Sequence, residues 1–277
     1  MNYTRIVQDV IEEHKAAPVD LLGIGNAADE YAYLNDHLGS YARTVRDIDN
    51  LFNGDRAGRN ILEIGSFLGT ASVSLKKMGY RMHALDIPEY HQSAALKSLY
   101  ERNGIPFEGS NLRRAKLPYE SNSLDAVIIC EVMEHLNFNP LPVLKEINRV
   151  LKNGGYVYIA MPNQAYIGNR LKLILGKSIH NPIRHFFLQL DRKFNVIVGL
   201  HWREYTLTET VEMVEKMGFS AVRQYYPLEP GCAVKGRLKA SLKKLAYLYP
   251  PFRPAQVVIG QKVASPDYDF WLTEANS

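Results

Sequence analysis

The feature that most constrains the fold is an alternation of short apolar runs with helical segments, which begins near residue 60. Short runs of apolar or β-branched residues bounded by turn residues predict buried strands, and strands that alternate with helices predict a parallel sheet. We therefore expect an α/β fold, a mostly parallel, Rossmann-like sheet with helices on both faces. Seven runs are expected to be strands: Asn60 to Ile64, Arg81 to Asp86, a weak run near Pro106, Leu124 to Cys130, Gly155 to Met161, Ala221 to Tyr226 and Ala255 to Val263.

The segments around these runs suggest the organisation of the chain. Residues 1–57 carry helical patterns from Thr4 to His14 and from Tyr41 to Phe52, and are expected to form an N-terminal helical cover. The main domain is expected to span residues 58–264, with a tail at 265–277. Residues 163–203 form a long connection of the kind that makes a lid over an acceptor, and residues 229–254 form a second insertion.

The second insertion has an uneven charge distribution. The whole chain has 33 Lys and Arg against 29 Asp and Glu, an excess too small to indicate a nucleic-acid binder. Between residues 230 and 266, however, there are seven basic residues and no acidic ones, and residues 237–249 have the pattern of a basic amphipathic helix. Residues 235–253 are therefore expected either to contact an anionic membrane or a phosphorylated substrate, or to form a solvated helix docked by leucines 238, 242 and 245.

Cysteine content and hydropathy bear on the location of the protein. The two cysteines, Cys130 and Cys232, form no C-x-x-C pair, so neither a disulfide framework nor a metal site is expected. The first residues do not have the pattern of a signal peptide, and the apolar stretches are shorter than the roughly 18 residues that a transmembrane helix needs. We expect a cytoplasmic protein, with peripheral contact to the inner face of a membrane as an open alternative.

The strongest local motif is the glycine turn that follows the first predicted strand, in the sequence ILEIGSFLGT from Ile61. Glycines at 65 and 69 allow the backbone to pass close to a ligand at the carboxyl end of the strand, where open α/β sheets bind ligands. The spacing G-x-x-x-G lacks the middle glycine of the dinucleotide fingerprint, which favours another nucleoside cofactor. Asp86 ends the next strand, where a carboxylate can accept both hydroxyls of a ribose.

Together with later motifs, this turn resembles the class I S-adenosylmethionine-dependent methyltransferases, in particular the small-molecule group related to ubiquinone and menaquinone methyltransferases. The resemblance covers about residues 59–226. It rests on E-x-G-x-x-x-G from Glu63, the strand-end Asp86, LP-x(5)-LD-x-V-I-x-x-E-V-x-E-H-L from Leu117, R-V-L-K-x-G-G from Arg149, and R-E-Y-T from Arg203. It implies seven strands with one reversed near the carboxyl end, and S-adenosylmethionine as cofactor.

The resemblance also implies which residues bind this cofactor. Four residues of the turn should line the methionine part, Asp86 the ribose and Ile87 the adenine, while Asn111 and Leu112 should lie near the adenine amino group. Cys130 and Glu131 should lie under the sulfonium. The residues of the turn are Glu63, Gly65, Ser66 and Gly69. Relatives that methylate DNA bases have a different turn after the fourth strand, which argues against a nucleic-acid substrate.

The expected activity is methyl transfer to a small-molecule acceptor, most simply at a hydroxyl oxygen, and the polar and aromatic lid favours a sugar or glycan precursor. A hydroxyl acceptor needs a base, and His135 and His201 are the candidates because imidazoles titrate near neutrality. Two alternatives stay open: a nicotinamide-dependent oxidoreductase on the same sheet, and a non-catalytic homologue that retains the cofactor pocket. Nothing in the sequence indicates the oligomeric state.

Overall fold

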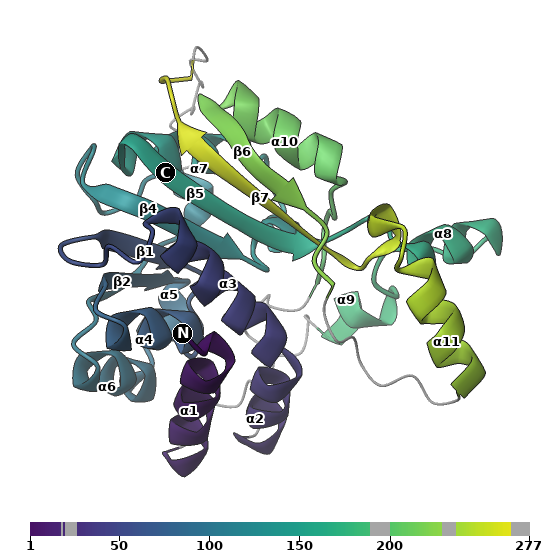
Figure 1. Ribbon diagram of the computed structural model, residues 1–277, viewed down its shortest axis with the longest axis horizontal. Coiled ribbons are helices and arrows are strands. Elements are labelled where there is room, and N and C mark those ends of the chain that lie inside the picture. The colour runs from purple at the N-terminus through teal and green to yellow at the C-terminus, as the bar shows by residue number, and fades with distance from the viewer. Residues whose placement is uncertain (18, 20–26, 189–199, 229–236, 267–277) are drawn as a thin grey trace.

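The computed structural model describes residues 1–17, 19, 27–188, 200–228 and 237–266, which form a central sheet between two layers of helices (Figure 1). The sheet has seven strands in the order β3-β2-β1-β4-β5-β7-β6. Of these seven, β7 alone runs in the direction opposite to the other six. The predicted α/β class and the single reversed strand near the carboxyl end are confirmed. The strands are β1 Asn60–Ile64, β2 Arg81–Asp86, β3 Phe107–Gly109, β4 Leu124–Cys130, β5 Leu151–Pro162, β6 Phe219–Tyr225 and β7 Ala255–Lys262.

The central strands are apolar on both faces because helices cover both. In β4, Ala126 and Ile128 pack toward one helical layer, whereas Val127 and Ile129 pack toward the other. Such continuous apolar runs are typical of parallel strands buried on both sides. The first layer contains α1 (Tyr3–Ala16), α3 (Leu38–Leu51), α4 (Thr70–Lys77) and α6 (Ala94–Arg102), and the second contains α7 (Leu141–Val150) and α10 (Leu207–Lys216).

The N-terminal segment is part of this layered structure. Helices α1 and α3 contact each other and α4, and α3 packs its apolar face onto the first core. A further helix, α2 (Ala27–Asp36), precedes α3 and was not predicted, because its sequence has little apolar periodicity. The boundary drawn at residue 57 stays a prediction.

The two insertions contain helices of their own. The segment after β5 forms α8 (Ile167–Ile174) and α9 (Arg184–Leu188), while residues 189–199 lie outside the described part of the chain. The basic insertion forms α11 (Arg237–Ala246) and a 3₁₀ turn, η3 (Pro250–Phe252), and its residues 229–236 are likewise outside the described part. Short elements complete the chain: α5 (Pro88–His91), η1 (Leu112–Arg114) and η2 (Met133–His135). No helix within the described ranges has the length and apolar character that crossing a membrane requires.

A buried carboxylate joins the N-terminal helices to the rest of the first layer. Asp49 on α3 accepts hydrogen bonds from Nε and Nη2 of Arg56 at 2.7 and 2.9 Å, from Tyr80 Oη at 2.8 Å and from Tyr3 Oη at 2.9 Å. The Arg56 guanidinium holds the pKa of this carboxyl below its usual value. Asp49 therefore connects α1, α3 and the residue that precedes β2.

We predict that Asp49→Asn lowers the free energy of unfolding by about 1–3 kcal/mol at pH 7, because the charge-assisted hydrogen bonds are lost. The depressed pKa means that the carboxylate stabilises the fold fully above about pH 4, and that this stabilisation is lost as the pH falls through the folded pKa. Urea unfolding measures the free energy of unfolding of the parent protein and of Asp49→Asn. The difference between these two free energies should be smaller at pH 3 than at pH 7. A constant difference would contradict this role, and the exposed Asp9→Asn serves as control.

Candidate functional site

The turn after β1 is held in a conformation that glycine favours. Gly65 and Gly69 have φ values of +74° and +67°, and Phe67 between them is also left-handed, at +46°. A Cβ at Gly65 would lie 2.2 Å from Val132 Cγ2, and one at Gly69 would lie 2.9 Å from Tyr100 Cε1. The two glycines are thus required by the backbone and by packing, in addition to any role toward a ligand.

Asp86, at the end of β2, fixes this turn. Its Oδ2 accepts a hydrogen bond from the Phe67 backbone N–H at 2.7 Å, and its Oδ1 accepts one from the Ile87 N–H at 2.8 Å. The carboxyl is buried, and burial raises its pKa to about 6. Each carboxylate oxygen can accept a second hydrogen bond, so the group can still receive two ribose hydroxyls.

Glu63 and Ser66 lie beneath the turn with partners of their own. Glu63 is buried, and its Oε2 accepts hydrogen bonds from the backbone N–H of Ser72 at 2.9 Å and from the Ser72 hydroxyl. Burial raises the pKa of Glu63 to about 7. The Ser66 hydroxyl accepts a hydrogen bond from Tyr100 Oη at 2.8 Å. These contacts give both residues a part in holding the turn, and their predicted contact with the cofactor stays a prediction.

The three residues predicted to surround the adenine lie at the start of the segments that follow β2 and β3. Ile87 is partly buried and immediately precedes α5, and it packs against the first core. Asn111 uses its side-chain oxygen to cap η1, accepting from the Arg113 N–H at 3.0 Å. Leu112 packs against the second core.

At the end of β4 the chain turns sharply at Glu131. This residue has a left-handed φ of +53°, and its N–H donates to the Ala160 carbonyl of β5 at 2.8 Å. A side chain other than glycine or asparagine in this region is uncommon and marks a strained turn. Cys130 precedes it, with Sγ 3.9 Å from Thr44 Oγ1, and burial raises the pKa of its thiol.

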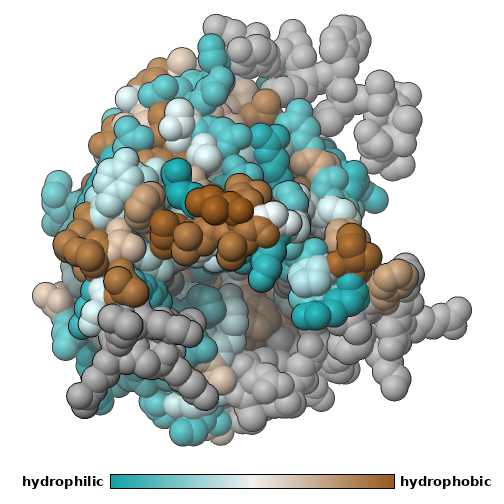
Figure 2. Space-filling view, turned by 90° about the vertical axis from the view of Figure 1, so that its right-hand side faces the viewer, coloured by the Kyte–Doolittle hydropathy of each residue, from teal (hydrophilic) through white to brown (hydrophobic). Residues whose placement is uncertain are grey.

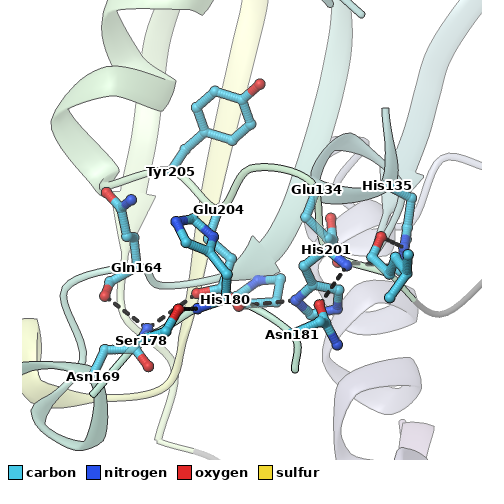
Figure 3. A network of polar contacts seen from close by, with 12 residues as sticks. Glu134, His135, Gln164, Asn169, Ser178, His180, Asn181, His201, Glu204 and Tyr205 are labelled. Atoms are coloured by element: carbon cyan, nitrogen blue, oxygen red, sulfur yellow. Dashed lines mark hydrogen bonds and ion pairs between the residues drawn. The ribbon is translucent and has the colours of Figure 1, made fainter. Parts of the chain in front are cut away.

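This turn brings together the two candidate histidines, which are 66 positions apart in the sequence. The rings of His135 and His201 pack edge to face with centroids 5.0 Å apart, next to the buried Glu134 (Figure 3). One ligand atom from each of these three residues lies within 4.8 Å of the others. The arrangement is one that could hold a metal ion.

Each imidazole uses Nδ1 for a hydrogen bond to an oxygen. His135 Nδ1 lies 2.9 Å from the Leu200 carbonyl, and His201 Nδ1 lies 2.8 Å from Glu204 Oε1. Glu204 also accepts from Asn169 Nδ2 at 3.1 Å, which fixes its position. An acceptor at Nδ1 orients the ring and leaves the Nε2 lone pair available, as in the outer shell of metal-binding histidines.

Glu134 is a buried acid without a donor. Both carboxylate oxygens are shielded from water, and no hydrogen bond reaches them from the described residues. Burial raises the pKa of Glu134 well above its usual value, and the charge of the nearby Glu131 adds to the effect. Burial also raises the pKa of Glu131 and lowers the pKa of His135. Glu134 Oε1 lies 3.9 Å from His135 Nε2, which can pair with the carboxylate when that ring is protonated. Because a buried carboxylate is costly unless it is paired, a cation bound here would stabilise it further.

The sequence did not predict this group as a metal site. No metal site is expected from the sequence, because the two cysteines form no C-x-x-C pair. In the structure Glu134 and His135 are adjacent, and the third member of the group follows the segment predicted to be a lid. The E-x-x-E-H pattern that starts at Glu131 was the available signal.

A second polar feature lies beside α3 and β6. A cavity of about 430 Å³ is lined by four arginines and no acidic residue among its described members, namely Gly39, Arg43, Arg46, Arg223, Gln224, Tyr225, Tyr226, Pro227, Leu228 and Arg253. The buried Asp47 contacts two of the arginines, Arg46 at 3.0 Å and Arg223 at 3.8 Å. Because four arginines line the cavity and the Asp47 carboxylate offsets only part of their charge, the cavity is suited to an anion. This cavity could not be predicted from the sequence, because its arginines come from three separate segments.

Comparison with known proteins identifies the family. Residues 62–159, from β1 through most of β5, match the family described as a methyltransferase domain. This part of the chain is similar to the methyltransferase domains of S-adenosylmethionine-dependent enzymes. The resemblance inferred from the sequence is confirmed, as is the choice of S-adenosylmethionine over a nicotinamide as the cofactor of the family.

Two relatives illustrate the breadth of this methyltransferase family. A probable S-adenosylmethionine-dependent methyltransferase from Mycolicibacterium smegmatis is 28% identical over 163 residues, which cover 59% of this chain and 52% of the relative. A ubiquinone biosynthesis O-methyltransferase from Xanthomonas oryzae is 27% identical over 111 residues, covering 40% of this chain and 46% of the relative. The chain thus spans about half the length of these two relatives.

Solved methyltransferase structures share the fold. Magnesium protoporphyrin IX methyltransferase from Synechocystis PCC 6803, crystallised with bound S-adenosylhomocysteine, superposes with a TM-score of 0.54 at 16% identity, covering 83% of this chain and 87% of the other. The sheet and helical layers are therefore those of this fold, while the substrate has to be argued from the site.

We predict that Asp86→Ala weakens S-adenosylmethionine binding by about 2–4 kcal/mol, because two charge-assisted hydrogen bonds to the ribose are lost. Isothermal titration calorimetry measures this directly. Asp55→Ala, which removes an exposed carboxylate before the amino end of β1, should leave the affinity unchanged. Equal affinity of Asp86→Ala and the parent protein would move the ribose site elsewhere.

Proposed function

We propose that the protein transfers a methyl group from S-adenosylmethionine to a hydroxyl oxygen of a small-molecule acceptor. The observation that carries the proposal is the group formed by Glu134, His135 and His201, which lies at the end of β4, beside the predicted sulfonium position. An amine acceptor needs no help with a proton once it is neutral, whereas a hydroxyl needs a base or a cation to favour its deprotonated form.

Methyl transfer is a displacement at carbon, so the protein chiefly aligns donor and acceptor and excludes water. The glycine turn and Asp86 hold the donor from one side. Glu131, in its strained turn, orients the chain that leads to Glu134. The segment around His201 then closes the other side, because its backbone packs against η2: the Trp202 N–H donates to the Glu134 carbonyl at 2.7 Å.

The residues of this group fit a divalent cation. The buried Glu134 carboxylate has no donor among the described residues, and both imidazoles are oriented through Nδ1. Glu134, His135 and His201 would hold the ion, with Glu131 as a further carboxylate nearby. When bound, such a cation supplies a positive charge that binds the acceptor oxygen and favours its deprotonated form. In the alternative, one imidazole is the base itself, as the sequence suggested.

The arginine cavity indicates the kind of acceptor. The cavity and the end of β4 are connected across the sheet by paired residues. Tyr225 of β6 pairs with Val257 of β7, and Val257 pairs with Ala160 of β5. Ala160 in turn pairs with Cys130, the last residue of β4. Three strand spacings of about 4.8 Å separate the cavity from the β4 end. An acceptor with a hydroxyl at one end and a phosphate or carboxylate at the other would span this distance. A sugar or glycan precursor that carries a phosphate meets this requirement.

The remaining expectations follow from this activity. We propose a cytoplasmic enzyme that acts on a small molecule. We also propose that it binds no nucleic acid, because the turn after β4 departs from that of DNA-base methyltransferases. The lid role of residues 163–203 is part of the same proposal. A non-catalytic homologue that binds the cofactor without turnover stays the main alternative.

The direct test is an assay with methyl-tritiated S-adenosylmethionine and a panel of sugars, sugar phosphates, phenols and amines. We predict label on a hydroxyl acceptor, and a fall in rate of roughly 100-fold or more on chelation with EDTA or in Glu134→Gln, with recovery of the chelated enzyme on adding Mg²⁺ or Mn²⁺. Glu215→Gln, an exposed substitution on α10, is the control.

Three outcomes would contradict the proposal in different ways. Label found only on amines would exclude the hydroxyl acceptor. A chelator-insensitive rate that falls in His201→Ala would favour a histidine base over a cation. Tight cofactor binding with no transfer to any member of the panel would favour the non-catalytic homologue.

We further predict that Arg46→Gln or Arg223→Gln raises KM about tenfold for a phosphorylated acceptor while kcat changes little, because each variant removes one charge-assisted contact far from the transferred methyl. For the same acceptor without its phosphate, the KM of each variant should equal that of the parent enzyme. Arg5→Gln, on the exposed face of α1, is the matched control. Unchanged KM values for both acceptors would exclude the cavity as an anion site.

A further inference from the structure

The helices of the two insertions expose an unusual amount of apolar surface. Eleven large hydrophobic side chains in α8, in α9 and the residues before it, and in and just after α11 are between 37% and 78% exposed. They are most of the 16 large hydrophobics that are exposed in the described part of the chain. We call them the apolar patch: Leu171, Leu173, Ile174, Leu175, Ile183, Phe186, Phe187, Leu242, Leu245, Leu248 and Tyr249.

The two insertions form this surface together, although 62 residues separate the end of α8 from the start of α11 in the sequence. Helix α8 contacts η3, which follows α11, and the Arg170 guanidinium lies 5.5 Å from the centroid of the Phe252 ring. In Figure 1, α8 and α11 project on the same side, beyond the edge of the sheet. Figure 2 looks at that side and shows hydrophobic side chains gathered in a band with hydrophilic ones around it.

Basic residues accompany the apolar patch. Arg170, Lys172 and Lys177 lie in or next to α8, Arg184 begins α9, and Lys243 and Lys244 lie in α11. Neither residues 163–188 nor residues 230–266 contain a single Asp or Glu. Leu242 and Leu245 of α11 are 56% and 65% exposed, so these two side chains do not dock the helix onto the core as one expectation had it. The side chain of residue 238, the third leucine of that expectation, lies outside the described part of the structure.

We propose that the apolar patch and its basic residues bind the surface of an anionic phospholipid membrane. Helices that combine exposed leucines with Lys and Arg lie in the membrane interface, where the apolar side chains enter the acyl boundary and the cations meet the headgroups. A second copy of the chain is a poor occupant, because pairing the patch with itself would bring two basic surfaces together. The proposal does not depend on the proposed methyl transfer.

The membrane surface is connected to the candidate site through α8. The exposed side of this helix carries Leu173 and Ile174, whereas Asn169 is buried and donates to Glu204, the partner of His201. A protein bound through α8 would thus hold His201 and its partner Glu204 near the lipid surface. An acceptor with a lipid tail could reach the site without leaving the membrane.

Sedimentation of the full chain with vesicles tests the proposal. One vesicle type contains phosphatidylglycerol mixed with phosphatidylcholine, and the other contains phosphatidylcholine alone. The protein should sediment with the anionic vesicles and little with the neutral ones. Raising the salt from 0.1 to 1 M should weaken binding, because the screening length falls from about 10 to about 3 Å.

Two pairs of matched variants separate charge from apolar contact. Lys172→Gln, Lys177→Gln and Lys244→Gln together should lower the partition coefficient by roughly fivefold per charge, on the order of 100-fold in all. Arg81→Gln, Lys97→Gln and Lys216→Gln remove the same charge from exposed positions elsewhere and should change it much less. Leu173→Gln with Ile174→Gln should lower it about tenfold or more, whereas Val222→Gln with Val263→Gln should not.

Two results would overturn the proposal. If the matched charge variants lose binding equally, the protein binds by its net charge and has no localised membrane surface. In the second result, the protein sediments with neither vesicle type and forms a concentration-dependent dimer in analytical ultracentrifugation. If Leu173→Gln with Ile174→Gln abolishes that dimer, the patch is a protein interface.

Discussion

The candidate site depends on two hydrogen bonds from backbone N–H groups to the Asp86 carboxylate. One comes from Phe67, in the middle of the glycine turn, and the other from Ile87, which follows Asp86 itself. Together they hold the turn after β1 against the end of β2, with Phe67 in a left-handed conformation that would otherwise be unfavourable. The carboxylate therefore shapes the turn before any ligand arrives, and its remaining lone pairs can accept the two ribose hydroxyls that we predict to bind there.

A second buried carboxylate follows the end of β4, two strands away from β2 across the sheet. The left-handed Glu131 turns the chain after β4 so that Glu134 and His135 lie under the segment that carries His201. The buried carboxylate of Glu134 lies 3.9 Å from His135 Nε2 and accepts no hydrogen bond from a described N–H group. We propose that a bound cation compensates its charge. Asn169 and Glu204 extend this group to α8, and so to the surface proposed to meet the membrane.

Much of the fold could be predicted from the sequence, because the signals for strands and turns are local. β1, β2 and β4 were predicted with the bounds that the structure gives, since each contains a short apolar run bounded by turn residues. Helix α2 was missed because its apolar periodicity is weak. The pairing of His135 with His201 and the gathering of four arginines could not be predicted, because both depend on how distant segments meet in space.

The most direct test of the account is a crystal structure of the protein grown with S-adenosylhomocysteine and Mn²⁺, with anomalous scattering used to locate the metal. The account predicts both ribose hydroxyls within hydrogen-bond distance of the Asp86 carboxylate, and the cofactor sulfur beside Cys130 and Glu131. It also predicts one anomalous peak coordinated by Glu134, His135 and His201. A cofactor bound away from Asp86 would contradict the central claim, and a cofactor in place with no metal at the three side chains would contradict the proposed role of that group.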